Sequence, residues 1–255
     1  MIRSPDYSLI AANYDQRYQE ERLVGVARLL RAIATQWSPK RIIEVACGTG
    51  HWLAQLPAHS HVLGIDKSMP MLSEAALKQG VFGLVQADAA ALPLGQESAD
   101  LLFCINALHH FPSPELFVEQ AARAVVPNGN LLIVGANPHK ASVDWYVYHY
   151  FEGVRALDES RFPSSDQTER WLVDRGFRIE AKGTAQPIRD AHIGSAVLET
   201  PFLRRRGCSQ MALLSDRAYR AGIDRIRQAV EADPEVIFTT SIDLDFVLAR
   251  RLAEP

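Results

Sequence analysis

The sequence predicts an α/β fold in which a doubly wound, mostly parallel sheet carries helices on both faces. After Pro39, short apolar runs alternate with amphipathic segments, and the runs are continuously apolar. Strand and helix in steady alternation are typical of parallel sheets, whose strands are buried on both sides. We expect seven strands, the last of them antiparallel, and helical C-terminal insertions over the cleft. The first five strands are expected at 41–46, 62–65, 82–86, 101–105 and 131–135.

Helical spacing of apolar residues predicts a first helix from Glu20 to Gln36. Two later helices open with Pro70 and Pro114, and proline suits the first turn of a helix. Beyond Asn137 the alternation ends, and two late strands are expected between helical insertions. The remaining predicted elements are helices at 52–56, 70–79, 114–125, 139–160, 168–175 and 190–232, and strands at 177–181 and 238–249.

Composition gives no general sign of nucleic-acid binding. The 255 residues hold 27 lysines and arginines against 30 aspartates and glutamates, so the net charge is −3, whereas phosphate binding usually shows as a basic excess. The three cysteines form no CxxC pair, which favours a reducing compartment. Since no apolar stretch approaches the about 18–20 residues of a membrane span, we expect a soluble, cytoplasmic protein.

A glycine-rich turn follows the first predicted strand. The stretch from Ile42 ends in Gly48-Thr49-Gly50, and glycines allow a tight turn and close approach of the backbone to a ligand. A helix beginning near His51 would direct unpaired N–H groups toward an anion. Taken alone, the pattern fits an ordinary strand-to-helix turn equally well.

Three further strand ends carry polar side chains. Asp66, Asp88 and Asn106 follow the second, third and fourth strands. Ligands of doubly wound folds bind at the carboxyl ends of the strands, and an acid after the second strand can accept both ribose hydroxyls. Each residue alone fits a turn or a helix cap. Together with Glu44 at the end of the first strand, they predict one shared site.

At these residues the chain resembles the class I S-adenosylmethionine-dependent methyltransferases, especially the small-molecule group with the ubiquinone/menaquinone-type and trans-aconitate-type enzymes. The resemblance covers about residues 10–137 and only loosely the rest. It implies S-adenosylmethionine as cofactor, S-adenosylhomocysteine as product, and in-line methyl transfer to a small-molecule acceptor. Glu44 stands where aspartate is commoner and Ala46 where glycine is commoner, and both changes leave the turn feasible.

The resemblance also assigns roles to residues. Glu44 and the glycines would surround the methionine end of the cofactor, Asp66 would bind the ribose hydroxyls, and Asp88 would face the adenine amino group. Lys67 and Met71 would flank the adenine. The implied cofactor-binding residues are Tyr14, Glu44, Ala46, Gly48, Gly50, Asp66, Lys67, Met71, Asp88, Ala89 and Asn106.

The whole chain is expected to form a single methyltransferase domain, 1–255. Its predicted parts are an N-terminal helical cover (1–38), a cofactor-binding core (39–137), helical insertions with the sixth strand that cover the substrate (138–235), and the last strand (236–255). In the N-terminal cover, Tyr14-Asp15 resembles the segment that folds over the methionine carboxylate.

His109 and His110 follow the fourth strand, beside the expected methyl position. Histidine can act as a general base near neutral pH, so both are candidate catalytic residues; simple packing beside the cofactor is the alternative. No compact ligand spacing among the histidines supports a metal site. The aromatic stretch Trp145–Phe151 fits either a packing face or the wall of an apolar substrate pocket.

Two other functions remain open for this sequence. An NAD-dependent oxidoreductase should carry a third glycine for close helix packing, where this chain has Leu53. A non-catalytic S-adenosylmethionine-binding module would keep the same motifs. The identity of the acceptor, the atom that is methylated, the pathway and the oligomeric state cannot be derived from the sequence.

Overall fold

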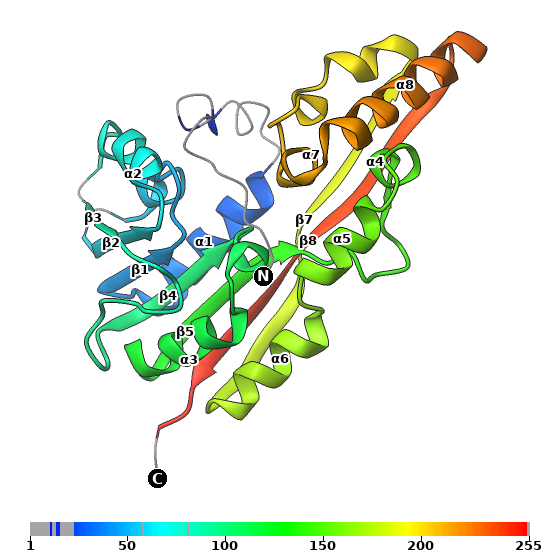
Figure 1. Cartoon of the computed structure of the whole chain (residues 1–255). Coiled ribbons are helices and arrows are strands. Elements are labelled where there is room, and N and C mark those ends of the chain that lie inside the picture. Colours follow the sequence, from blue (N-terminus) through cyan, green and yellow to red (C-terminus); the bar gives the residue numbers. More distant parts are fainter. Residues whose placement is uncertain (1–10, 12–13, 16–22, 58, 81, 254–255) are drawn as a thin grey trace.

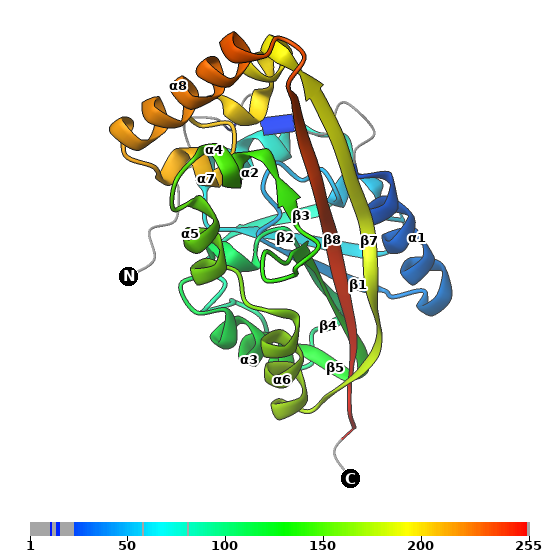
Figure 2. The ribbon, with the colours of Figure 1, turned by 90° about the vertical axis from the view of Figure 1, so that its right-hand side faces the viewer.

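The computed structural model describes the chain apart from residues 1–10, 12–13, 16–22, 58, 81 and 254–255. Its described residues form a twisted central sheet with helices on both sides, and a long two-stranded ribbon carries the sheet past its edge (Figures 1 and 2). The strands are β1 (Arg41–Val45), β2 (His61–Asp66), β3 (Phe82–Gln86), β4 (Ala99–Ile105), β5 (Val125–Ala136), β6 (Asp144–Trp145), β7 (Phe177–Ile193) and β8 (Ile237–Arg251).

The strands join in the order β3-β2-β1-β4-β5-β8-β6, with β7 paired to β8. All pairs from β3 to β5 are parallel, and β8 runs antiparallel to β5, β6 and β7. The predicted α/β fold and antiparallel last strand are therefore confirmed. The two-residue β6 adds one strand to the seven expected. From β1 the chain builds the sheet in one direction through β2 and β3, and then in the other direction through β4 and β5. Ligands of such sheets bind at this switch point.

The helices cover the two faces of the sheet. Helix α1 lies on one face, and α3 and α6 lie on the other (Figure 2). Their bounds are α1 (Val24–Trp37), α2 (Met69–Ala76), α3 (Pro114–Ala124), α4 (Tyr146–Tyr150), α5 (Val154–Arg161), α6 (Ser165–Asp174), α7 (Ser209–Leu213) and α8 (Asp216–Ala232). Within the described ranges, no helix is both long and apolar enough to cross a bilayer.

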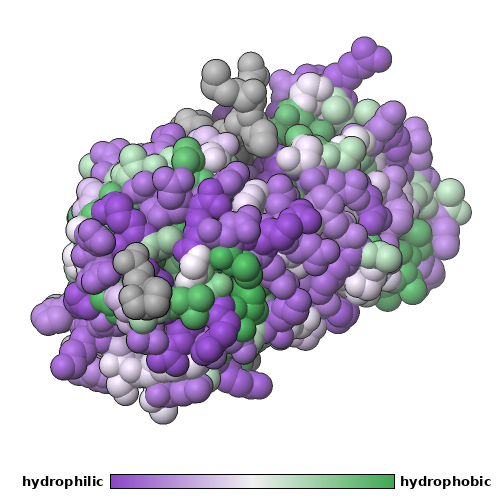
Figure 3. Space-filling model, turned by 90° about the horizontal axis from the view of Figure 1, so that it is seen from below, coloured by the Kyte–Doolittle hydropathy of each residue, from purple (hydrophilic) through white to green (hydrophobic). Residues whose placement is uncertain are grey.

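The segment Leu101–Ile105 of β4 is continuously apolar because of its place in the sheet. Leu101 and Phe103 lie in the core beneath α1, whereas Leu102 and Cys104 lie in the core beneath α3 and α6. Because successive side chains point to opposite faces of a strand, the part of a central strand that lies between two helical layers needs apolar residues on both faces. From below, the surface is mainly polar, with small apolar patches (Figure 3).

A third core lies away from the sheet centre, on the extension of β7 and β8. Helices α4, α7 and α8 pack there around Phe151, Met211 and Ile226, at the upper right of Figure 1. Gly222 of α8 is required by this packing, because a Cβ atom at this position would lie 2.1 Å from the Phe151 ring. These helices thus form their own layer over the β7/β8 hairpin, the antiparallel pair of Phe177–Ile193 and Ile237–Arg251.

Three predicted helices differ from the structure. Trp52–Leu56 holds only a one-turn 3-10 helix, Leu53–Gln55. The single helix expected over 139–160 is divided into β6, α4 and α5. Asp144–Trp145 pair with β8, and Gly153 takes a left-handed conformation (φ 77°) between α4 and α5. Residues 190–193 belong to strand β7 and not to a helix, since each pairs with β8. The first helix begins at Val24, and part of its predicted start falls outside the described residues.

Candidate active site

A cavity of about 580 Å³ lies at the carboxyl ends of β1, β2, β3 and β4. This volume is within the range of about 300–1,000 Å³ that is usual for cofactor and small-molecule pockets. Every predicted cofactor-binding residue except Gly50 lines it. They are Tyr14, Glu44, Ala46, Gly48, Asp66, Lys67, Met71, Asp88, Ala89 and Asn106. The structure therefore brings the polar ends of four successive strands to one space.

Glu44 is a buried acid in the wall of this cavity. Its side chain lies at the end of β1 and the residue is 1% exposed. Burial raises the pKa of Glu44 well above its ordinary value, the charge of Asp66 raises it further, and Lys78 acts in the opposite direction. Oε2 of Glu44 has no hydrogen-bond partner within the described part of the chain. A buried acceptor of this kind fits a ligand that brings a donor into the cavity.

The turn after β1 has positive φ angles, which glycine adopts most easily. Ala46, Gly48 and Gly50 have φ angles of 59°, 53° and 71°, in the region that L residues seldom adopt. Gly50 turns away from the cavity and packs on α2, where a Cβ atom would lie 3.1 Å from Ala75. The helix expected at His51 is wrong: residues 51–52 form a turn. The N-terminus of an α-helix therefore cannot act on an anion here.

Asp66 joins the turn to the start of α2. Its Oδ2 accepts a hydrogen bond from Gly48 N and its Oδ1 accepts one from Ser68 N, both at 2.8 Å. Burial raises the pKa of Asp66, and the backbone donors oppose this shift. Lys67 N is a third backbone donor to this carboxylate. Its two oxygens offer about four lone-pair sites, so the carboxylate can still accept a hydroxyl from a ligand in the cavity. The carboxylate is thus held in place before any ligand binds.

Asp88 and Lys67 form the far end of the cavity. Lys67 Nζ lies 2.9 Å from Asp88 Oδ2, and Ala90 N donates to Asp88 Oδ1 at 3.0 Å. The hydrogen bond from Lys67 is the main reason that the pKa of Asp88 is lowered. The lowered pKa favours the ionised form of Asp88, and the Lys67 side chain that contacts it is 75% exposed. Met71, on α2, is buried at the same end.

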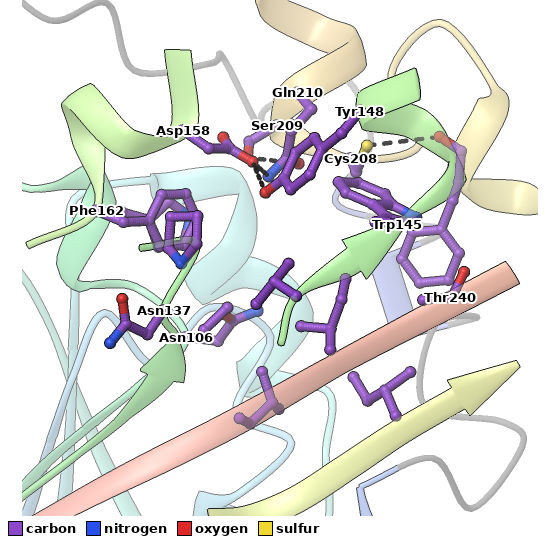
Figure 4. Close-up of a pocket in the computed structure, with 18 of the residues that line it drawn as sticks. Asn106, Asn137, Trp145, Tyr148, Asp158, Phe162, Cys208, Ser209, Gln210 and Thr240 are labelled. Atoms are coloured by element: carbon purple, nitrogen blue, oxygen red, sulfur yellow. Dashed lines mark hydrogen bonds between the residues drawn. The ribbon is translucent and has the colours of Figure 1, made fainter. Parts of the chain in front are cut away.

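A second, smaller cavity of about 170 Å³ adjoins the first and shares Tyr14, Asn106 and His110 with it. Asn106 follows β4 with φ 51°, a conformation that asparagine tolerates better than most residues. Aromatic side chains form much of the wall, and Figure 4 shows Trp145, Tyr148 and Phe162 around the space. This joined cavity lies under the C-terminal insertions.

His109 and His110 differ in their environments. His110 lines both cavities, whereas His109 lines the smaller one and not the larger. The His109 ring is stacked on Phe162, with ring centroids 3.8 Å apart and planes at 9°. Burial, with the nearby charges of His110 and Arg161, lowers the pKa of His109 well below its ordinary value. Its ring is therefore neutral at physiological pH.

An ion pair that sequence analysis did not predict holds Asp15 beside the turn after β1. Lys78 Nζ lies 2.5 Å from Asp15 Oδ2 and 3.3 Å from Thr49 Oγ1, and Thr49 also bonds to Asp15. These contacts fix the turn that carries Tyr14, which lines both cavities. This ion pair could not be predicted from the sequence, because Asp15 and Lys78 lie far apart in the chain and on different predicted elements.

Comparisons with known proteins agree with this geometry. Residues 43–133 match the methyltransferase domain family. The demethylmenaquinone methyltransferase of Thermus thermophilus is 26% identical over 74% of this chain and 98% of its own length. A malonyl-[acyl-carrier protein] O-methyltransferase of Legionella pneumophila is 28% identical over 53% of this chain, which spans only 50% of that enzyme. A protein of Bacillus halodurans C-125 with a methyltransferase designation has a TM-score of 0.64 at 21% identity, over 89% and 99% of the two chains; a likeness this remote supports the fold alone.

Proposed function

Because the chain is a class I S-adenosylmethionine-dependent methyltransferase of the small-molecule group, we propose that its larger cavity holds S-adenosylmethionine and its smaller cavity holds the methyl acceptor. The observation that carries this assignment is the convergence of Glu44, Asp66, Asp88 and Asn106 on one space. A nucleoside joined to an amino acid presents hydroxyls, ring donors and an ammonium group, and each of these needs an acceptor of this kind.

The assignment gives each acid a partner. The orphaned Oε2 of Glu44 would accept from the ammonium group of the methionine portion, and Asp66 would accept the two ribose hydroxyls through lone pairs that Gly48 and Ser68 leave available. Asp88 would face the adenine amino group after Lys67 moves aside. When bound, the cofactor supplies a methyl group on a sulfonium, which is already activated toward displacement.

The protein's remaining task is to position the acceptor, exclude water and, where the acceptor needs it, take a proton. His110 is the histidine that lines both cavities, so we assign it the role of general base for an oxygen or nitrogen acceptor. His109 lies against Phe162 and supports the wall. Tyr14 and Asn106, at the junction of the cavities, would hold the acceptor in line with the methyl group.

Ligand-dependent stability tests the proposal. S-adenosylhomocysteine at 100 times its Kd should stabilise the protein by about 2.7 kcal/mol, whereas NAD should have no effect. Asp66→Asn should weaken S-adenosylhomocysteine binding at least tenfold by calorimetry, while Asp243→Asn, a matched change on β8 outside both cavities, should not. Stabilisation by NAD and not by S-adenosylhomocysteine would contradict the assignment.

The two alternative functions make different predictions. For an oxidoreductase, the place of the third glycine is taken by Leu53, which is 2% exposed and fills the space against Gly64 of β2. A non-catalytic binding module would bind S-adenosylhomocysteine but transfer no methyl group. An assay of radiolabelled methyl transfer to a panel of metabolites separates catalysis from binding alone. For an enzyme, His110→Ala should lose rate and keep its affinity for the cofactor. The cytoplasmic location stays a prediction.

A further inference from the structure

The β7/β8 hairpin forms the floor of the smaller cavity. On β8, the alternating residues Thr240, Ile242 and Leu244 line it, and on β7 so do Ile188, Asp190 and His192. The strand register pairs Ile188 with Ile242 and Asp190 with Thr240. Since alternate residues of a strand share one face, these six side chains form one continuous surface under the cavity.

This floor has a direction. Leu244 pairs with Ala136 at the end of β5, and β5 lies beside the β4 end that carries Asn106, so Leu244 marks the end nearest the cofactor. Thr240 lies four residues further along β8, which is about 13 Å at the usual rise of a strand. In Figure 4, Asn106 and Thr240 accordingly lie at opposite sides of the pocket. The cavity is elongated along the hairpin.

The chemistry of the floor changes along this length. Near the cofactor it consists of Leu244, Ile242 and Ile188, which bring no hydrogen-bonding groups. At the far end it presents the Asp190 carboxylate and the Thr240 hydroxyl, with His192 Nε2 3.4 Å from Asp190 Oδ2. A carboxylate only accepts hydrogen bonds, so a group that binds to Asp190 must donate one.

The roof of the cavity also contains an acidic residue, Asp158, whose hydrogen bonds go to other side chains of the protein. Asp158 is 1% exposed and accepts hydrogen bonds from Arg161 at 2.7 Å, Tyr148 at 2.9 Å and Gln210 at 2.8 Å. These donors compensate its charge and join α5 to α4 and α7 (Figure 4). Asp190 lies on the floor itself, where its Oδ1 accepts a hydrogen bond from Ala191 N at 2.9 Å and its side chain is 31% exposed. Asp158 is thus enclosed by protein donors, whereas the Asp190 side chain is partly exposed.

We propose that Asp190 determines acceptor specificity by binding an ammonium or hydroxyl group at the end of the acceptor remote from the methylated atom. The inference rests on the proposed function, since it takes the smaller cavity as the acceptor site. It defines the acceptor class: a small, elongated molecule with a flat apolar body that fits between Trp145, Tyr148 and Phe162, and with a hydrogen-bond donor at its distal end.

Matched phenols test this inference on the full-length protein loaded with S-adenosylhomocysteine. The probes are phenols with a para tail of two to four carbons that ends in an amine, a hydroxyl, a methyl or a carboxylate group. By calorimetry, the best amine- or hydroxyl-ended probe should bind at least tenfold more tightly than its methyl-ended match, and the carboxylate-ended probes should bind most weakly.

Variants assign the preference to the residue. Asp190→Asn should reduce the advantage of the amine-ended probe at least tenfold, with unchanged S-adenosylhomocysteine affinity. Asp243→Asn is the control, because Asp243 lies on the other face of the same hairpin, paired with exposed Arg189. Equal or absent binding of all probes to the loaded protein, or the same loss in both variants, overturns the inference. Failure to bind S-adenosylhomocysteine overturns the proposed function instead.

Discussion

Replacing Glu44 by glutamine should stabilise the free protein and weaken its affinity for the cofactor. In the free protein the Glu44 carboxylate is buried and its Oε2 has no partner among the described residues, so ionisation at neutral pH is costly. Glutamine keeps the shape and removes the charge. With the cofactor bound, the same carboxylate would accept from an ammonium group, and glutamine loses the charge that strengthens this bond.

The two effects can be given magnitudes. A buried polar group that lacks its partner costs about 1–3 kcal/mol. The uncharged amide of glutamine is also polar and keeps part of this cost. We therefore expect Glu44→Gln to raise the free energy of unfolding by about 1–2 kcal/mol at pH 8. A hydrogen bond to a charged group is worth about 1.5–3 kcal/mol, so the Kd for S-adenosylhomocysteine should rise by about 10–100-fold.

The gain should depend on pH in one direction. Because the folded pKa of Glu44 lies well above its ordinary 4.5, the protonated form is favoured by folding. Its contribution to stability is fully present below pH 4.5 and is lost as the pH rises through the folded pKa. The advantage of Glu44→Gln should therefore shrink between pH 8 and pH 5.

Urea unfolding at these two pH values and calorimetry with S-adenosylhomocysteine measure both effects. Asp100→Asn is the contrasting variant, because Asp100 accepts from Lys40 N, Arg41 N and the Arg41 guanidinium outside the cavity. It should lose stability and keep its cofactor affinity. A Glu44→Gln protein that is less stable at pH 8, or binds S-adenosylhomocysteine as the wild type does, would refute the reasoning.

Three further changes give separate expectations. Gly222→Ala ought to lower stability by about 1–3 kcal/mol in urea unfolding, because overpacking against Phe151 outweighs the gain of about 1 kcal/mol in helix propensity; a rise in stability would contradict this contact. His109→Phe should have a free energy of unfolding within about 1 kcal/mol of the wild type at pH 8. A histidine with a lowered pKa contributes stability that is lost on acidification, so the wild type should lose stability as the pH falls below 6.5 and the variant should lose less. Equal losses in urea unfolding would count against the burial of His109. Lys78→Ala should weaken S-adenosylhomocysteine binding about two- to fivefold by releasing Asp15, in line with the under 1 kcal/mol of a partly exposed pair, whereas Lys182→Ala, which breaks a pair with Glu169 outside both cavities, should leave the Kd unchanged.

The sheet and the polar ends of its strands were predictable from the sequence because both depend on local pattern. A strand segment buried on two faces must be apolar, as β4 is from Leu101 to Ile105, and polar residues at the strand ends stand out against it. Asp66, Asp88 and Asn106 were identified in this way. Their convergence follows from the parallel order of the strands.

Features that depend on tertiary contacts were not predictable. The turn after β1 takes positive φ angles at Ala46, Gly48 and Gly50, and a strained turn leaves no room for a regular helix at His51. Strand β7 continues far beyond Ala181, although Lys182 and Pro187 favour no strand, because pairing with β8 supplies its hydrogen bonds and an edge strand tolerates proline.

The closed end of the β7/β8 hairpin has a consequence for how such proteins diversify. Ile193 pairs with Ile237, and Gly194 N donates to Val236 O at 2.9 Å, so residues 194–236 leave and rejoin the hairpin at a single point. An insertion with adjoining ends can be exchanged or shortened without shifting the register of the strands below it. Residues 202 and 208–210 of this segment line the smaller cavity and not the larger one. Under the proposed function, we therefore expect exchange of residues 194–236 to change the acceptor site and leave the larger cavity as it is.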